Sequence, residues 1–198
     1  MKKIIIASNN PGKLREIGAL LAPLKIEVLP QAVFSIPEAD EPHATFVENA
    51  LAKARHASKL CNLPALADDS GLCVEALDGA PGVLSARYGG EPKSDERNNL
   101  KLLRVLHAAT DRRAYYYCVI ALTRHAGDPQ PLIAEGVWQG EILHAPRGSG
   151  GFGYDPLFYV PQLKQSAAEL AAEVKNKISH RGQALAQLAA KLRVNSEW

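Results

Sequence analysis

The sequence predicts an α/β protein with a mixed central β-sheet flanked by helices. Residues 3–29 read as strand, loop, helix and strand, which is the building unit of α/β folds. Residues 113–144 contain apolar segments joined by short turns, a pattern typical of antiparallel strands. At 198 residues and 46% hydrophobic content, with no break in composition, the chain can bury one core. We therefore expect a single domain over residues 1–198.

The first elements follow from hydrophobic spacing. An apolar run predicts a strand over Lys3–Ala7, and a second short strand is expected over Ile26–Leu29. The segment between them, Lys13–Leu24, is predicted to be a helix with one apolar face made by Leu14, Ile17, Leu21 and Leu24.

A second helix is predicted over Phe46–Leu60, because "TFVE" at its start is a capping box. Strands over Pro64–Ala67 and Leu72–Leu77 are then expected to flank a turn at Asp68–Gly71. Two adjacent carboxylates in an apolar run need such a turn, charged partners or a cation, because an unpaired buried charge is costly.

The second half of the chain continues with helices and strands. We expect a helix over Asp95–His107, and two closing helices that begin at Ser166 and Ser179. Strands are expected over Arg113–Thr123, Leu132–Trp138 and Glu141–His144.

Composition excludes several classes of protein. A net charge of +2 with 22% charged residues does not suit a dedicated nucleic-acid binder. No segment approaches the roughly 20 apolar residues that span a bilayer, and the apolar start is too short for a signal peptide. Three widely spaced cysteines indicate neither a disulfide framework nor a zinc site. We expect a cytoplasmic protein without membrane or nucleic-acid partners.

The motif "SNNPGK" joins the first strand to the first helix, where free amides and the helix dipole favour an anion. Pro11 and Gly12 shape the turn, and Ser8, Asn10 and Lys13 add a hydroxyl, an amide and a positive charge. The pattern indicates a phosphate cradle, although it is not a P-loop and an ordinary polar turn is the alternative.

Acidic residues form a second candidate site. Glu41 meets Asp68 and Asp69 if their loops lie at one edge of the sheet, and three carboxylates would suit Mg²⁺. Solvated loop charges, or a turn capped by Asp69 and Ser70, are the alternatives.

Two later motifs carry groups that suit a planar base. "FGYDP" combines two aromatic rings, a glycine and a carboxylate, which suits stacking and acceptance of a ring N–H, although taken alone it reads as a packed core loop. "KNKISHR" places His180 and Arg181 in the first turn of the last helix, where cations oppose the dipole and indicate a bound anion or carbonyl-rich ligand. Exposed surface cations are the alternative.

In order, "SNNPGK", "EP" before "TFVENA", "ADDSGL", "GAPGVLSARY", "GGFGYDP" and "ISHRGQAL" resemble the inosine triphosphate pyrophosphatase family, in particular its bacterial RdgB-like dITP/XTP pyrophosphatases. The resemblance runs from about residue 3 to residue 192. It implies an elongated α/β fold with two lobes around a deep substrate cleft, usually as a homodimer. It also implies Mg²⁺-dependent hydrolysis of ITP, dITP and XTP to the monophosphate and pyrophosphate, which removes deaminated purines from the nucleotide pool.

The resemblance also implies roles for individual residues. Asp69 matches the general base and, with Glu41, the magnesium ligands; because Pro42 and His43 stand where the family usually has Thr-Gly, Asp40 is an alternative to Glu41. The triphosphate would be bound by Ser8, Asn9, Asn10, Pro11, Gly12, Lys13 and Lys53, with Ser70 as a further substrate contact. The base would be enclosed by Phe152, Gly153, Tyr154, Asp155, Lys175, His180 and Arg181. For Asp68, a structural role in the turn is the alternative to a place in the site.

Two rival functions stay open at this point. One is a pyrophosphatase for another nucleotide, such as dUTP or a modified pyrimidine. The other is a non-catalytic nucleotide sensor or RNA-binding protein, although three acids near the phosphates would repel an RNA backbone unless a metal bridged them.

Overall fold

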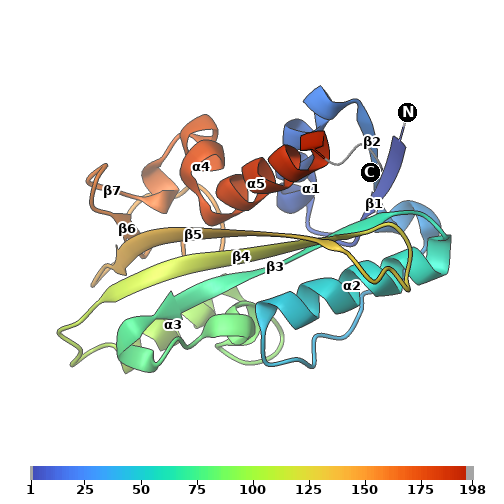
Figure 1. Ribbon diagram of the computed structural model, residues 1–198. Coiled ribbons are helices and arrows are strands. Elements are labelled where there is room, and N and C mark those ends of the chain that lie inside the picture. Colours follow the sequence, from blue (N-terminus) through green and yellow to red (C-terminus); the bar gives the residue numbers. More distant parts are fainter. Residues whose placement is uncertain (1, 195–198) are drawn as a thin grey trace. The chain divides into compact units, whose positions relative to one another are not determined.

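The computed structural model describes residues 2–194. Within them, seven strands form one sheet in the order β2-β1-β3-β4-β5-β6-β7 (Figure 1). The strands are β1 Lys2–Ile6, β2 Ile26–Pro30, β3 Ala65–Val74, β4 Arg113–Thr123, β5 Leu132–Ile142, β6 Phe158–Val160 and β7 Gln165–Ser166. Strand β1 pairs in parallel with β2 and β3, whereas β6 pairs antiparallel with β5 and β7. The predicted mixed sheet is therefore confirmed.

Five α-helices accompany the strands in the described part of the chain. They are α1 Pro11–Leu21, α2 Phe46–Cys61, α3 Asp95–Val105, α4 Ala172–Ile178 and α5 His180–Val194. Short 3₁₀ turns lie at Ala22–Leu24, Gln31–Phe34, Glu75–Leu77, Gly82–Arg87 and Ala167–Glu169. Over residues 2–194, none of the helices combines the length and the apolar content needed to cross a membrane.

Several predicted elements are confirmed, and four need correction. Strand β4 has the predicted bounds, and the Thr45 hydroxyl caps α2 by accepting from the Glu48 amide at 3.3 Å. Helix α1 begins at Pro11 and stops at Leu21, because Pro23 cannot donate the amide that a continuing helix requires. The capping box of Ser166 opens only a 3₁₀ turn, and α4 starts at Ala172.

The other two corrections concern strands. The two strands predicted over residues 132–144 are one continuous strand, β5. The two strands predicted around Asp68–Gly71 are also one, β3, and Glu75–Leu77 form a 3₁₀ turn instead of its end. There is therefore no turn at the paired aspartates.

The chain divides into two compact units, each made of segments that are distant in the sequence. Unit 1 comprises Met1–Asp69, Cys118–Gly136 and Arg181–Trp198, and unit 2 comprises Ser70–Tyr117 and Val137–His180. The lobed arrangement around a cleft stays a prediction.

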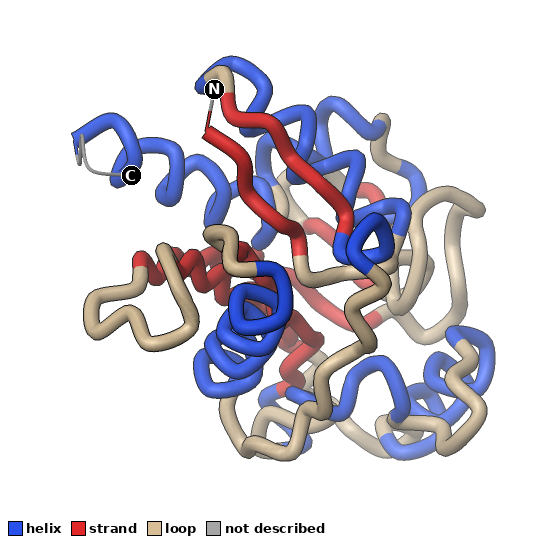
Figure 2. Tube along the Cα trace, turned by 90° about the vertical axis from the view of Figure 1, so that its right-hand side faces the viewer, coloured by secondary structure: helices blue, strands red, loops and turns tan. Residues whose placement is uncertain are grey.

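Unit 1 places helices on both faces of its strands. Helices α1 and α5 pack on one face, where Ile17 and Leu185 join the apolar core around Leu66 of β3 (Figure 1). Helix α2 covers the other face with small residues such as Ala50 and Ala54, which allow close approach to the sheet. In Figure 2, β1 and β2 run side by side next to the N-terminus.

Unit 2 has a core of its own. Tyr116, Trp138 and Phe158 form an aromatic cluster, with ring centroids 4.6 Å apart for Tyr116 and Phe158 and 5.1 Å apart for Trp138 and Phe158. Leu102 and Leu106, from α3 and the residue that follows it, are fully buried in the same core. This packing fixes α3 against the strands of unit 2, and α3 then contacts the loop that carries "FGYDP".

Candidate active site

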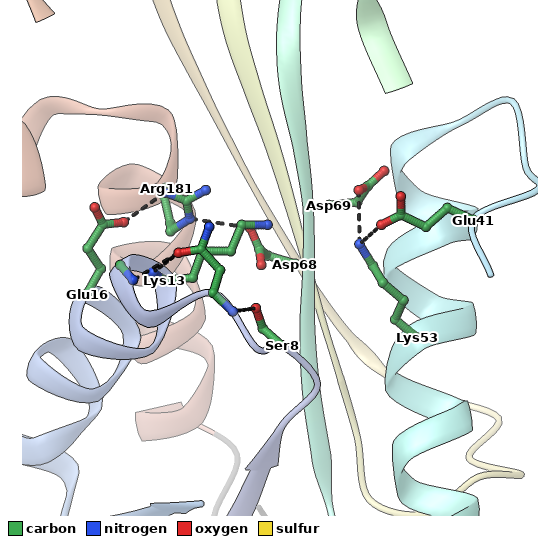
Figure 3. A network of polar contacts seen from close by, with 10 residues as sticks. Ser8, Lys13, Glu16, Glu41, Lys53, Asp68, Asp69 and Arg181 are labelled. Carbon is green, nitrogen blue, oxygen red and sulfur yellow. Dashed lines mark hydrogen bonds and ion pairs between the residues drawn. The ribbon is translucent and has the colours of Figure 1, made fainter. Parts of the chain in front are cut away.

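Strand β3 carries both Asp68 and Asp69 in its interior, where both residues are buried. Because successive side chains of a strand point to opposite faces, Asp68 shares a face with Leu66, and Asp69 lies on the face of Ala67. Figure 3 shows Asp68 directed toward Lys13 and Arg181 on one side of β3, and Asp69 toward Lys53 on the other. Ion pairs on both faces replace the turn that the sequence predicted.

The face of Asp68 holds four charged side chains. The Asp68 Oδ2 lies 2.9 Å from the Lys13 Nζ and 3.3 Å from the Arg181 Nε, and the Arg181 Nη1 lies 2.8 Å from the Glu16 Oε2. Burial alone would raise the pKa of the Asp68 carboxyl, but Lys13 and Arg181 hold that pKa well below its usual range. Asp68 is therefore an ionised carboxylate that joins α1 to the start of α5.

The loop Ser8–Lys13 leads from β1 into α1 on this same face. The Asn10 Oδ1 accepts from the amides of Gly12 at 2.9 Å and Lys13 at 3.2 Å, and the Ser8 Oγ accepts from the Asn10 amide at 3.1 Å. The Asn9 side chain donates to the Glu38 Oε1 at 3.3 Å. Asn10 thus caps α1, while Pro11 occupies its first position.

The face of Asp69 holds the second group. The Lys53 Nζ of α2 lies 2.7 Å from the Glu41 Oε1 and 3.0 Å from the Asp69 Oδ1 (Figure 3). The Asn49 Nδ2, one turn earlier on α2, lies 3.4 Å from the Asp69 Oδ2 and also donates to the His43 carbonyl at 3.2 Å. Helix α2 therefore holds the strand and the Glu41–His43 loop together, and Glu41, not the exposed Asp40, is the acid that reaches the group.

The pKa values on this face are shifted by burial and by neighbouring charges. Burial raises the pKa of Asp69, and Lys53 offsets that effect only in part while Glu41 adds to it. Burial would lower the pKa of Lys53, but the carboxylates of Asp69, Asp68 and Glu41 outweigh it and raise that pKa. Lys53 is thus a fixed cation next to a carboxylate whose basicity is increased.

Glu41 and Asp69 fit the requirements of a magnesium site. Both are hard oxygen donors, and both reach the same ammonium nitrogen, so their carboxylates converge on one place. Among the described residues, no three His, Cys, Asp or Glu side chains meet as a ready-made metal site. Two carboxylates are nevertheless typical of Mg²⁺ sites that share the ion with water and substrate phosphates.

In unit 2, the "FGYDP" segment forms a loop fixed by its own carboxylate. The Asp155 Oδ2 accepts from the Phe152 amide at 2.9 Å and pairs with the Lys175 ammonium of α4. The Lys175 Nζ lies 5.0 Å from the centroid of the Phe152 ring, which is 42% exposed. The Tyr154 ring is buried and donates its hydroxyl to the Ser85 carbonyl at 2.8 Å.

The predicted base-binding residues belong to both compact units. Phe152, Asp155 and Lys175 meet in unit 2, and His180 stacks there on Tyr116 with ring centroids 4.6 Å apart. Arg181 instead belongs to unit 1 and pairs with Asp68. Ser70 follows Asp69 in β3. The contact of Ser70 with substrate stays a prediction, as do the substrate-binding roles of the other residues that the family resemblance implied.

Sequence reasoning missed three partners of these groups. Glu16 lies three residues after Lys13 on α1, and Asn49 lies four residues before Lys53 on α2. Those spacings place each on the face of a predicted site residue, so the helical period could have indicated them. Asn99 of α3, which donates to the Gly153 carbonyl at 2.8 Å, has no such signal because its partner is 54 residues away.

The fold is that of an α/β protein, and one of its strands, β3, carries ion-paired side chains on both of its faces. Comparison with known proteins makes the class specific: the chain belongs to the Ham1 family, which it matches over residues 4–191. This confirms the resemblance that six motifs indicated.

Individual relatives agree over nearly the whole length. A dITP/XTP pyrophosphatase of Nitrosomonas europaea is 66% identical over 195 residues, which cover 98% of this chain and 96% of the relative. The solved structure of a HAM1 protein from Coxiella burnetii has a TM-score of 0.94 at 53% identity, covering 98% of this chain and all of that one. The Staphylococcus aureus Ham1 protein has a TM-score of 0.89 at 43% identity, with 98% and 99% covered.

Proposed function

We propose that this protein hydrolyses the non-standard purine nucleoside triphosphates dITP, ITP and XTP to the monophosphate and pyrophosphate, removing deaminated purines from the nucleotide pool. The observation that carries the proposal is the Lys53 ammonium between the Glu41 and Asp69 carboxylates, at 2.7 and 3.0 Å. Its support is the identity of 62 to 66% to relatives that are named dITP/XTP pyrophosphatase.

The charged side chains would bind the triphosphate. Lys13 and Lys53 supply positive charge from the two faces of β3, and Ser8 and Asn10 supply polar groups beside Lys13. Transfer of a phosphoryl group depends mainly on positioning and on charge neutralisation, which fixed lysines provide.

The charge balance of the group supports a magnesium ion. On the two faces of β3, three cations are paired with four carboxylates, so the group as a whole is negative. A triphosphate would be repelled unless a cation were added. Glu41 and Asp69 would hold Mg²⁺, which would neutralise charge on the phosphates. With the two carboxylates engaged in holding the ion, the Lys53 ammonium would be available to a phosphate oxygen.

Asp69 is the proposed general base. Its raised pKa, caused first by burial, makes the ionised carboxylate a better proton acceptor than an exposed aspartate. It would orient a water for in-line attack on the α-phosphorus, with pyrophosphate as the leaving group. Asp69→Asn should abolish turnover, and near-wild-type turnover by that variant would contradict this role.

Base selection has a physical basis in the hydrogen-bond donors of one cationic side chain, either Lys175 or Arg181. Hypoxanthine and xanthine present a keto oxygen at C6 that accepts a hydrogen bond, whereas adenine presents an amino group that would face these donors. Buried donors left unpaired are costly, and polar pockets discriminate by factors of about 10⁴ or more. Lys175, paired with Asp155 and next to the Phe152 ring, carries the base-side donor in unit 2.

The test is pyrophosphate release from ITP, dITP, XTP, GTP, dUTP and ATP, with magnesium and with a chelator. We expect rapid magnesium-dependent release from ITP, dITP and XTP and little from ATP. Guanine shares the C6 keto oxygen, so the low release that we expect from GTP depends on its exocyclic amine at C2. Release from dUTP alone would favour the pyrimidine rival, and salt-dependent RNA binding without turnover would favour the RNA-binding rival.

A matched pair of variants tests the metal ligands. Glu41→Gln should weaken Mg²⁺ binding measured by calorimetry, whereas Asp40→Asn, which changes the exposed neighbouring acid, should not. Equal effects of both substitutions would contradict the assignment of Glu41. The family resemblance also leads us to propose a cytoplasmic homodimer, which light scattering of the purified protein tests for its oligomeric state.

A further inference from the structure

Helix α3 holds the backbone of the "FGYDP" loop through hydrogen bonds to both the amide and the carbonyl of Gly153. The Gly153 amide donates to the Asp95 Oδ2 at 2.7 Å, and the Gly153 carbonyl accepts from the Asn99 Nδ2 at 2.8 Å. Asp95 and Asn99 are four residues apart and so share one face of α3. The Asn99 Nδ2 also donates to the Asp95 carbonyl at 2.7 Å, which ties the two anchors together.

Gly153 is the point in the loop where such anchors matter. Its φ is +64°, a left-handed conformation that glycine adopts readily and that gives the backbone no intrinsic preference for staying there. The hydrogen bonds from α3 select this conformation, and the buried core contacts of α3 around Leu102 make the anchor rigid.

The positions of Phe152 and Asp155, on either side of Gly153 in the loop, depend on where Gly153 is held. Phe152 precedes it and donates its amide to Asp155, and Asp155 in turn holds the Lys175 ammonium. The orientation of the exposed Phe152 ring and the placement of the Asp155 carboxylate therefore follow from where α3 fixes the loop.

We propose that Asp95 and Asn99 are positioning residues for recognition of the base, acting through the Gly153 peptide on Phe152 and the Asp155–Lys175 pair. The inference rests on the proposed function, because it assigns the base to this loop. Neither side chain is required to touch the substrate, and neither belongs to the charged groups on β3.

The physical consequence is a selective loss of affinity for the base. A loop released from α3 must be reordered when the base binds, and this cost lowers affinity for ITP. Phosphate binding by unit 1 does not depend on the loop, so affinity for a triphosphate without a base should be unchanged.

Four substitutions distinguish the loss of the hydrogen bonds to Gly153 from a general change in the stability of α3. Asn99→Asp keeps the side-chain shape but places an acceptor opposite the Gly153 carbonyl, and Asp95→Ala removes the acceptor of the Gly153 amide. Asp95→Asn retains an acceptor oxygen and should recover most of the loss caused by Asp95→Ala. Glu96→Ala, at an exposed acid in the same first turn, is the matched control for helix stability.

The experiment measures dissociation constants by calorimetry, in the presence of Mg²⁺, for inorganic tripolyphosphate and for a non-hydrolysable analogue of ITP. Loss of one or two hydrogen bonds should weaken ITP binding by Asn99→Asp and Asp95→Ala roughly tenfold, with tripolyphosphate binding unchanged. Steady-state kinetics should show the same increase in KM for ITP with kcat nearly unchanged.

Three results would overturn the proposal: unchanged ITP affinity in both variants, equal losses for ITP and tripolyphosphate, or an equal loss in Glu96→Ala. Failure of the proposed function has a separate signature, because wild-type protein would then release no pyrophosphate from ITP, whatever the binding data of the variants show.

Discussion

Replacing Asp68 with asparagine should destabilise the folded protein strongly, even though the side-chain shape is conserved. The Asp68 Oδ2 lies 2.9 Å from the Lys13 Nζ and 3.3 Å from the Arg181 Nε, and only 3% of the residue is exposed. With an effective dielectric constant of about 20, each contact attracts by about 5 kcal/mol. Desolvation of the three charges offsets most of that attraction, so the pairs add little net stability.

The free-energy cost of removing Asp68 is larger than the net contribution of its ion pairs to stability, because the largely buried Lys13 and Arg181 would lose the carboxylate that compensates their charge. Such losses are about 3–5 kcal/mol, and we expect about 3 kcal/mol for Asp68→Asn. The lower end applies because asparagine keeps an acceptor oxygen and Arg181 keeps its contact with Glu16. In urea unfolding followed by circular dichroism, the midpoint should fall by about 1 M or more.

The control is Asp111→Asn, the same chemical change at an exposed pair. Asp111 and Arg113 lie 2.6 Å apart, closer than either contact of Asp68, but the Arg113 side chain is 73% exposed. Exposed pairs contribute little, so this midpoint should match that of the wild type. If Asp68→Asn also unfolds at the wild-type urea concentration, the argument that burial decides the effect is refuted.

Three further predictions concern other parts of the chain. Lys53→Met leaves the Glu41 and Asp69 carboxylates without the ammonium between them and should lower kcat/KM for ITP by about 100-fold or more, whereas Lys59→Met, at an exposed lysine of the same helix, should not. Gly151→Ala should raise KM for ITP, because a Cβ would lie 2.0 Å from the Asp155 Oδ2 at a residue with φ +74°; Gly18→Ala, where a Cβ meets nothing within 4 Å, should bind ITP normally. Hydrogen bonds from Arg124 hold the pKa of Asp128 well below its usual range, so its carboxylate stabilises the fold above about pH 4 and loses that effect as the pH falls toward the folded-state pKa. The stability difference between wild type and Asp128→Asn, from urea unfolding at several pH values, should therefore shrink in acid; a constant difference would contradict this account.

Local signals in the sequence were sufficient for the elements that depend on local physics. The apolar spacing over Lys13–Leu24 and the capping box at Thr45 predicted two helices that the structure contains, α1 and α2. Glu41 and Asp69 were expected to meet if their loops lay at one edge of the sheet. They share the Lys53 ammonium, although Asp69 lies inside β3 and not in a loop.

The continuity of β3 could not be predicted in this way. Aspartate is unfavourable in strand interiors, so two in succession indicate a turn. The cations that make the strand tolerable come from residues 13, 53 and 181, which are far from β3 in the sequence, and only the fold brings them there. The same applies to Asn99, whose contact with Gly153 depends on how α3 packs in unit 2.

The adjacency of Asp68 and Asp69 makes the register of β3 unusually strict. One backbone step separates a carboxylate that organises Lys13 and Arg181 from one that faces Lys53 and Glu41. A one-residue insertion or deletion earlier in β3 would exchange the faces of the two side chains. One aspartate would then stand where the other had been, and the second group would have Ala67 or Ser70 in place of its carboxylate. Evolution can therefore adjust the two groups by changing side chains on α1, α2 and α5, but not by sliding the strand on which both depend.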